Sequence, residues 1–188
     1  MADASNVVIH YKEVLEFWFT EPATKLWFKP TPEFDEFIFT KFHSLWLRAK
    51  ENHLSLWEKS AEGCLALAIV LDQFPLNMFR DTSKSFSTEA DAIRISRYAI
   101  ANSFDEALDK SHVSFLYMPL MHSENIQDQN LSVKLFKQAN LENNLRYAKH
   151  HRDIIANFGR FPHRNMILNR ISTTAELKYL ASPQAFKG

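Results

Sequence analysis

The sequence predicts an all-α protein, and three observations support this prediction. Apolar side chains recur every three or four residues through most of the chain, which is the spacing of one face of a helix. No stretch alternates convincingly with a period of two, and hairpin turns of the Asn-Gly or Asp-Gly kind are absent. Only 3 glycines occur in 188 residues, so helix interiors are rarely interrupted. We therefore expect about eight helices, with antiparallel neighbours, in a single domain over residues 1–188.

Three helices are expected in the first part of the chain, over residues 6–19, 33–50 and 61–74. The third is apolar almost all round, which is typical of a central buried helix. We expect Pro75 to end it in a Phe-Pro turn. Asp72 would then lie in the last turn, where the helix dipole disfavours an anion, so its carboxylate needs a cationic partner. Three arginines are candidates for that partner: Arg80, Arg160 and Arg164.

Four further helices are expected over residues 87–102, 104–117, 120–139 and 141–158. The side chains of Thr88 and Asp91 are candidates to cap the first of them. The second is expected to end near Pro119. If the third is continuous, then His122 and Gln129, seven residues apart, share one of its faces.

The remaining helix signals lie near the C-terminus. On the helix over 141–158, the apolar stripe includes His151 but not His150, so His151 is expected to be buried with a hydrogen-bond partner. Gly159 directly follows this helix, in the position of a left-handed cap. Thr173 and Glu176 have the spacing of a capping box at the start of the last helix.

Composition excludes several classes of protein. Lys+Arg and Asp+Glu both count 22, so the chain lacks the basic excess of a nonspecific nucleic-acid-binding surface. The longest apolar run, from Cys64 to Leu71, is far shorter than the roughly 20 residues of a membrane span. The N-terminus does not read as a signal peptide, and the single cysteine favours a reducing cytoplasm. We expect a cytoplasmic protein that binds neither nucleic acid nor membrane.

Polar side chains with useful chemistry collect at the expected helix ends. The richest stretch is residues 158–165, where a rigid Gly-Arg-Phe-Pro turn carries cationic and ionisable groups. There is no glycine-rich phosphate loop, dinucleotide fingerprint, His-Glu-x-x-His or paired-cysteine motif, so no cofactor is expected. The set of candidate groups is Asp72, Gln73, Arg80, His122, Glu124, His151, Arg160, His163 and Arg164.

Four interpretations of this set remain open. The arginines could bind an anion in a pocket where His122 or His163 moves protons. His122, Glu124, His151 and His163 are suitable metal ligands, but no pair has the helix spacing of a metal motif, so no metal is expected. A nucleophilic triad with Ser123 or Ser172 is disfavoured, because no strand-turn-helix elbow is present. The charges could also form a purely structural salt-bridge network.

Three stretches carry a resemblance to a known family. They are Leu71-Asp72-Gln73-Phe74-Pro75 with Arg80, Tyr117-Met118-Pro119 with His122-Ser123-Glu124, and Phe158 to Asn165 followed by Arg170. Together they resemble the bacterial family known as domain of unknown function 924. The resemblance implies an all-helical fold of tetratricopeptide-like helix pairs and no assigned activity. Leu76 departs from the basic residue that the family usually has there, which weakens the expectation of a second cation in that motif.

The function expected from these observations is the binding of a small anionic ligand in a polar pocket, with catalysis left open. Its expected ligand-binding residues are Asp72, Arg80, His122, Glu124, His151, Arg160, His163, Arg164 and Asn165. The alternative is a helical-repeat module whose groove binds a protein partner, with a structural salt-bridge network and no catalysis.

Overall fold

The structure is a computed structural model that describes residues 9–187, and every regular element in that range is helical. The all-α prediction is confirmed. The tetratricopeptide-like pairing stays a prediction. Within the described range, the helices are α1 (Tyr11–Trp18), α2 (Ala23–Leu26), α3 (Pro32–Lys50), α4 (Ala61–Ala68), α5 (Phe74–Met78), α6 (Glu89–Ala101), α7 (Lys110–His122), α8 (Ile126–Gln138), α9 (Glu142–Phe158) and α10 (Thr174–Leu180). Val7 and Val8, which the first expected helix included, lie outside the described residues.

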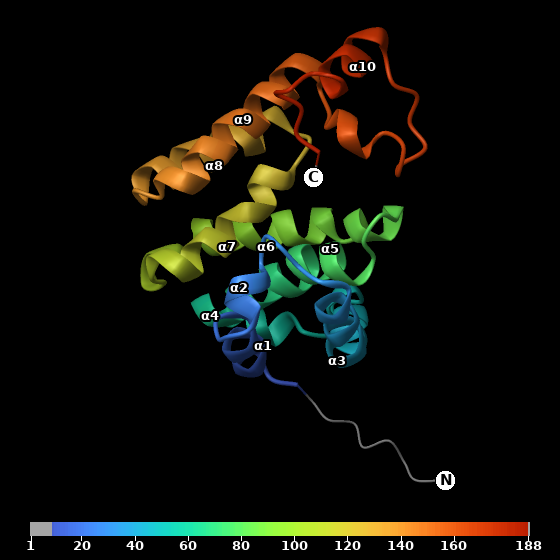
Figure 1. The fold of residues 1–188 in the computed structure, drawn as a ribbon. Helices are drawn as coiled ribbons and strands as arrows, with labels where there is room; N and C mark the ends of the chain where they lie inside the picture. Colours follow the sequence, from blue (N-terminus) through green and yellow to red (C-terminus); the bar gives the residue numbers. More distant parts are fainter. Residues whose placement is uncertain (1–8, 188) are drawn as a thin grey trace, which may run out of the picture.

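The helices form successive tiers along the molecule (Figure 1). Helices α1 to α4 lie at one end, α5 to α7 lie across the middle, and α8 and α9 run side by side toward the other end, near α10. One large apolar core extends from Val14 on α1 to Ala148 on α9. A smaller core of Ile154, Ile155 and Phe161 joins the end of α9 to the segment that follows. No helix in residues 9–187 is long and apolar enough to cross a membrane.

The chain remains helical through Pro75, so the expected Phe-Pro turn at this place is wrong. A π-helical turn, Ile69–Gln73, joins α4 to α5, and the Phe74 N–H donates to the carbonyl oxygen of Ile69. Proline has no N–H to give to the carbonyl four residues earlier, which here belongs to Leu71. The Thr88 hydroxyl donates to that Leu71 oxygen instead, at 2.7 Å. A donor from a distant segment therefore stabilises a helix that local rules would end.

The same hydrogen bond explains why Thr88 does not cap α6 with its side chain. Thr88 occupies the N-cap position, but its hydroxyl makes no capping hydrogen bond. It lies between two buried partners, donating to Leu71 and accepting from the indole N–H of Trp46 at 3.1 Å. Thr88 therefore ties α3, the π-turn and the start of α6 together.

The second proline prediction is also corrected. Pro119 lies inside α7, which continues to His122, and the chain then breaks before α8 begins at Ile126. His122 and Gln129 are consequently on different helices. The Gln129 side-chain amide closes the break by donating to the carbonyl oxygens of Met121 at 2.6 Å and Ser123 at 2.7 Å. The break places His122 at a helix end, where its ring can reach a neighbouring helix.

The expectations near the C-terminus are confirmed. Gly159 has φ of 71° and is the left-handed cap of α9. His151 is buried, with 4% of its surface exposed, and its Nδ1–H donates to the carbonyl oxygen of Tyr147 at 2.8 Å. Thr173 and Glu176 form the expected capping box at α10. Residues 162–164 then form a short 3-10 turn that carries His163 and Arg164 toward α7 and the start of α6.

Candidate functional site

The partner of Asp72 is His122 and not an arginine, which corrects the sequence prediction. The π-turn presents Asp72 to the last residue of α7, and Nδ1 of His122 lies 2.8 Å and 3.0 Å from the two carboxylate oxygens. The amide of Gln73 also donates to this carboxylate. The Asp72 side chain is 4% exposed and that of His122 is 19% exposed. The pair is thus anchored in the interior and reaches water through the imidazole.

Arg164 is a buried brace beside this pair. Its Nη1 donates to Glu89 at 2.7 Å and its Nη2 to the carbonyl oxygen of His122 at 2.8 Å. The guanidinium lies over the rings of Phe86 and Phe161, at 4.5 Å and 4.6 Å. Burial raises the pKa of Glu89, although the charge of Arg164 opposes that effect. We call Asp72, Glu89, His122 and Arg164 the helix-end cluster.

Glu124 belongs to a second ion pair, next to the helix-end cluster. Arg170 holds its carboxylate with two bonds of 2.6 Å and 2.9 Å, and the Phe161 N–H donates to it at 2.8 Å. Burial alone would raise the pKa of Glu124, but the hydrogen bonds from Arg170 and Phe161 lower it overall. The Nε–H of Arg170 also donates to the side-chain oxygen of Asn165 at 3.0 Å, which places Asn165 in this network and not in an opening.

Arg160 pairs with the capping residue of α10. It donates to both carboxylate oxygens of Glu176, at 2.6 Å and 2.9 Å, and to the carbonyl oxygen of Ile171 at 2.8 Å. The hydrogen bond from Arg160 is the main reason why the pKa of Glu176 falls to about 2. Arg160 therefore fixes the connection before α10.

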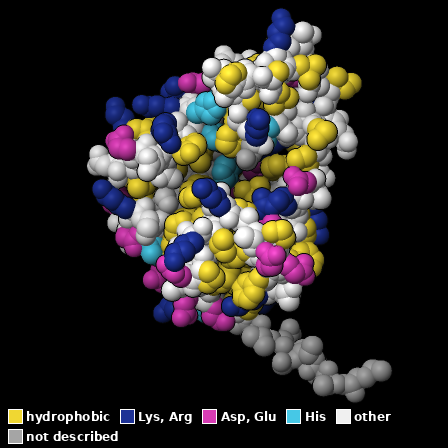
Figure 2. Space-filling view, in the orientation of Figure 1, with side chains coloured by type: hydrophobic (Ala, Val, Ile, Leu, Met, Phe, Trp, Pro, Cys, Tyr) yellow, Lys and Arg dark blue, Asp and Glu magenta, His cyan; other side chains and the backbone are white. Residues whose placement is uncertain are grey.

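Two more histidines lie near His122 and are kept neutral. Burial lowers the pKa of His151 to about 3 and that of His163 to about 4, and the charge of His122 contributes in the same direction to both. Phe186, near the C-terminus, covers them with ring-centre distances of 4.4 Å to His151 and 5.0 Å to His163. Figure 2 shows histidine side chains in the middle of the visible face, with Lys and Arg side chains around them.

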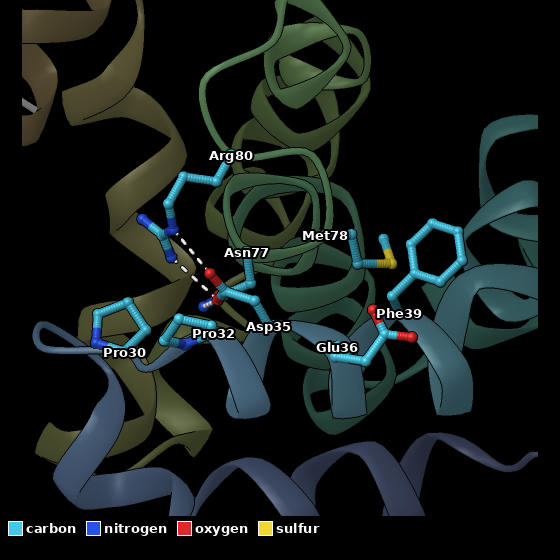
Figure 3. Close-up of a pocket in the computed structure, with 8 residues that line it drawn as sticks. All are labelled: Pro30, Pro32, Asp35, Glu36, Phe39, Asn77, Met78 and Arg80. Atoms are coloured by element: carbon cyan, nitrogen blue, oxygen red, sulfur yellow. Dashed lines mark hydrogen bonds and ion pairs between the residues drawn. The ribbon is translucent and has the colours of Figure 1, made fainter.

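Arg80 stands apart from the residues with which it was grouped. It donates to the Asp35 carboxylate through Nε at 2.7 Å and Nη2 at 3.0 Å. This ion pair lines a hollow of about 530 Å³ between α3 and α5, where Asn77, Met78 and Phe39 are also found (Figure 3). We call this the α3–α5 hollow. Of the nine expected ligand-binding residues, Arg80 is the one that lines it.

The structure therefore places five of the other expected residues in ion pairs at helix ends, namely Asp72, His122, Glu124, Arg160 and Arg164. Asn165 bonds to Arg170 in the same network, whereas His151 and His163 form no ion pair with any described residue. Sequence reasoning missed three of the counter-charges: Asp35, Glu89 and Arg170. Each pairs with a residue 45, 75 or 46 positions away, respectively, so no local spacing indicates the contact. Arg170 did carry a signal, because it follows the stretch on which the family resemblance depends. Within residues 9–187, no group of three or more His, Cys, Asp and Glu side chains is arranged to hold a metal ion.

Among the comparisons with known proteins, a family model identifies the family. The model described as "Bacterial protein of unknown function (DUF924)" matches residues 14–184. A solved structure of a protein of unknown function from Agrobacterium tumefaciens is 35% identical, with a TM-score of 0.85 over 91% of this chain and 96% of that one. No curated protein shows significant similarity to the chain. The chain belongs to the bacterial family of unknown function DUF924.

Proposed function

We propose that this protein binds a small anionic molecule at the helix-end cluster, with His122 as the residue that contacts it. The observation that carries the proposal is the Asp72–His122 pair. Because the carboxylate holds Nδ1, the free nitrogen of the ring is Nε2, on the opposite side from Asp72. A carboxylate behind an imidazole fixes its tautomer and stabilises the imidazolium that forms when Nε2 takes a proton.

Two neighbouring atoms add to this argument. Nε of Arg164 and Nδ1 of His163 are buried without a hydrogen-bond partner among the described residues. A buried polar atom without a partner loses its hydration and gains nothing in return, so such atoms are uncommon and often mark a bound water or ligand. An anion within reach of these atoms would give the Arg164 Nε–H the acceptor that it lacks, and would do the same for Nδ1 of His163 in the tautomer that carries a proton there.

The arginines have a different role from the one expected of them. Each is already paired with a carboxylate, so they supply geometry and not a free positive charge. In the proposed site, Arg164 holds the end of α7, and His122 meets the ligand. The Asp72–His122 pair can also transfer a proton, so catalysis on the bound anion is a natural extension of the proposal.

A thermal-shift screen with inorganic phosphate, phosphate esters and small carboxylates tests the proposal. The informative variant is His122→Asn, because its amide can keep a donor near Asp72 while the ring Nε2 is lost. The matched control is Arg80→Ala, which removes a cation outside the cluster. We expect at least one anion to raise the melting temperature of the wild type and of Arg80→Ala, but not of His122→Asn. A panel that shifts nothing, or that shifts all three proteins equally, would contradict the proposal.

A protein-binding module is the second candidate, and one observation favours it. Three apolar side chains after the 3-10 turn are well exposed: Met166 at 86% and Ile171 at 91%, which precede α10, and Leu177 at 57%, which lies on α10. Exposed apolar side chains that gather in one segment are a feature of interaction surfaces. If they bind a partner, replacing Met166 and Ile171 by serine should abolish its capture under mild salt, whereas His122→Asn should not.

A further inference from the structure

We propose that the α3–α5 hollow binds a small primary alkylammonium ion, at a site separate from the helix-end cluster. The wall of the hollow near Arg80 is electrically balanced. The Asp35 carboxylate accepts two hydrogen bonds from Arg80 and one from the Asn77 amide at 2.8 Å. Because Asp35 accepts these three bonds and its charge offsets that of Arg80, neither group provides the main electrostatic attraction for a ligand.

Asn77 provides an acceptor in the lining of the hollow. The ionised Asp35 carboxylate can only accept, so the Asn77 atom that bonds to it must be the amide nitrogen, which fixes the orientation of the side chain. Its Oδ1 then receives no hydrogen bond from any described residue. Asn77 as a whole is 7% exposed, and it lines the hollow. A carbonyl oxygen without a protein donor can accept a hydrogen bond from a ligand that carries N–H groups.

Glu36 supplies the unbalanced negative charge. It lines the hollow beside Phe39 (Figure 3), and its only described hydrogen bond is a long one of 3.4 Å from Thr40. Three ionised side chains line the hollow: Asp35 and Glu36, each −1, and Arg80, +1. Their sum is −1. Because Asp35 and Arg80 are paired with each other, Glu36 is the charge in this lining that attracts a cation.

The remaining wall is suited to an alkyl chain. Met78 and the ring of Phe39 line the same side of the hollow as Glu36, and Pro30 lies beside Pro32 on the opposite side (Figure 3). The Phe39 ring is held by stacking on His43, with a centre distance of 4.7 Å. An aromatic face attracts an ammonium group, and a thioether packs against methylene groups. An ammonium head with a short apolar tail matches both the charge and the lining.

An NMR titration of the full chain with n-butylammonium chloride tests this inference, with tetramethylammonium chloride and sodium butyrate as comparison probes. We expect saturable shifts at Asn77 and its neighbours with butylammonium. Tetramethylammonium should bind more weakly, because it has no N–H for Asn77, and butyrate should not bind. Glu36→Gln should weaken butylammonium binding about five-fold, the scale of one exposed ion pair.

Glu33→Gln is the matched control, because it removes the same charge from the first turn of α3 without lining the hollow. The inference would be overturned by any of three results. The first is a titration with butylammonium that does not saturate by about 50 mM, well above a dissociation constant of about 1 mM. The second is an equal loss of butylammonium affinity in Glu33→Gln and Glu36→Gln. The third is an equal affinity for butylammonium and tetramethylammonium. None of them bears on anion binding at His122.

Discussion

Acid should destabilise this protein through a buried histidine, His151. Burial lowers its pKa in the folded chain from 6.5 to about 3, because the charged ring would lose its hydration. The unfolded chain therefore takes up a proton at a higher pH than the folded chain does. The stability that His151 lends is fully present above pH 6.5 and is lost as the pH falls toward 3.

The size of the effect follows from the pKa difference. A pH of 5 lies about 1.5 units below the pKa of His151 in the unfolded chain, so the ring is protonated there, whereas the ring in the folded chain is still neutral. Each unit of this difference corresponds to about 1.4 kcal/mol of unfolding free energy. His151 alone should thus remove about 2 kcal/mol of unfolding free energy between pH 7 and pH 5. The pKa of His163 is lowered to about 4, so it acts in the same direction.

Urea unfolding at the two pH values, followed by tryptophan fluorescence, measures this loss. His151→Phe keeps a ring against Phe161 and Phe186 but cannot take a proton. Its unfolding free energy should fall by about 2 kcal/mol less than that of the wild type over this pH range. His53→Gln is the control, because the His53 side chain is 63% exposed. If His151→Phe shows the same pH dependence as the wild type, then burial of a neutral His151 is not what makes the fold acid-sensitive.

Three further substitutions test individual features of the fold by urea unfolding. Gly159→Ala should cost about 1 kcal/mol, from the positive φ alone, because no heavy atom lies within 4 Å of the added Cβ; an unchanged stability would contradict the left-handed cap. Thr88→Val should cost about 2 kcal/mol, because the Leu71 carbonyl oxygen and the Trp46 indole N–H both lose the hydroxyl as a partner, and Thr88→Ser should restore most of the loss. The stability that Glu124 contributes, because its pKa is lowered, is present above pH 4.5 and is lost as the pH falls below it. Glu124→Gln should therefore lose less stability than the wild type on acidification below pH 4.5, and an equal loss would argue against the pair with Arg170.

Features set by a few adjacent residues could be predicted from the sequence. Gly159 after an amphipathic stretch, the capping box at Thr173, and the inward face that holds His151 each depend on local geometry. For these, the spacing of side chains along a helix is sufficient. The all-α class follows from the same periodicity.

The two internal prolines show where local reasoning fails. A proline such as Pro75 ends a helix when the carbonyl oxygen four residues earlier finds no other donor. Here that oxygen belongs to Leu71, and the hydroxyl of Thr88, 17 positions farther along the chain, donates to it. The π-turn next to it also moves Asp72 to face α7, which no helix-dipole argument would suggest. Pro119 also lies inside a helix, α7, where local rules would end it. At Pro75, a tertiary contact decided the element.

The partners of the charged groups could not be predicted for the same reason. The sequence indicated which side chains are chemically important, but ion pairs such as Glu89–Arg164 join segments far apart in the chain. In the fold, the arginines form ion pairs that hold segments together, and the ring of His122 reaches the solvent. The sequence had suggested a pocket lined by arginines. The identity of the residue that meets a ligand depends on these pairings.

The central claim is that the helix-end cluster consists of a structural brace, Arg164, and a ligand-contacting pair, Asp72–His122. The most direct test compares Arg164→Ala and His122→Asn with the wild type, measuring both the unfolding free energy and the thermal shift produced by the best anion of the panel. The account predicts a loss of about 3 kcal/mol for Arg164→Ala, because the partly buried Glu89 carboxylate and the carbonyl oxygen of His122 lose their partner. For His122→Asn it predicts a loss of about 1 kcal/mol or less, because a hydrogen bond to Asp72 is kept, and no thermal shift with the anion. Equal stability losses in both variants, with an anion response retained in His122→Asn, would contradict it.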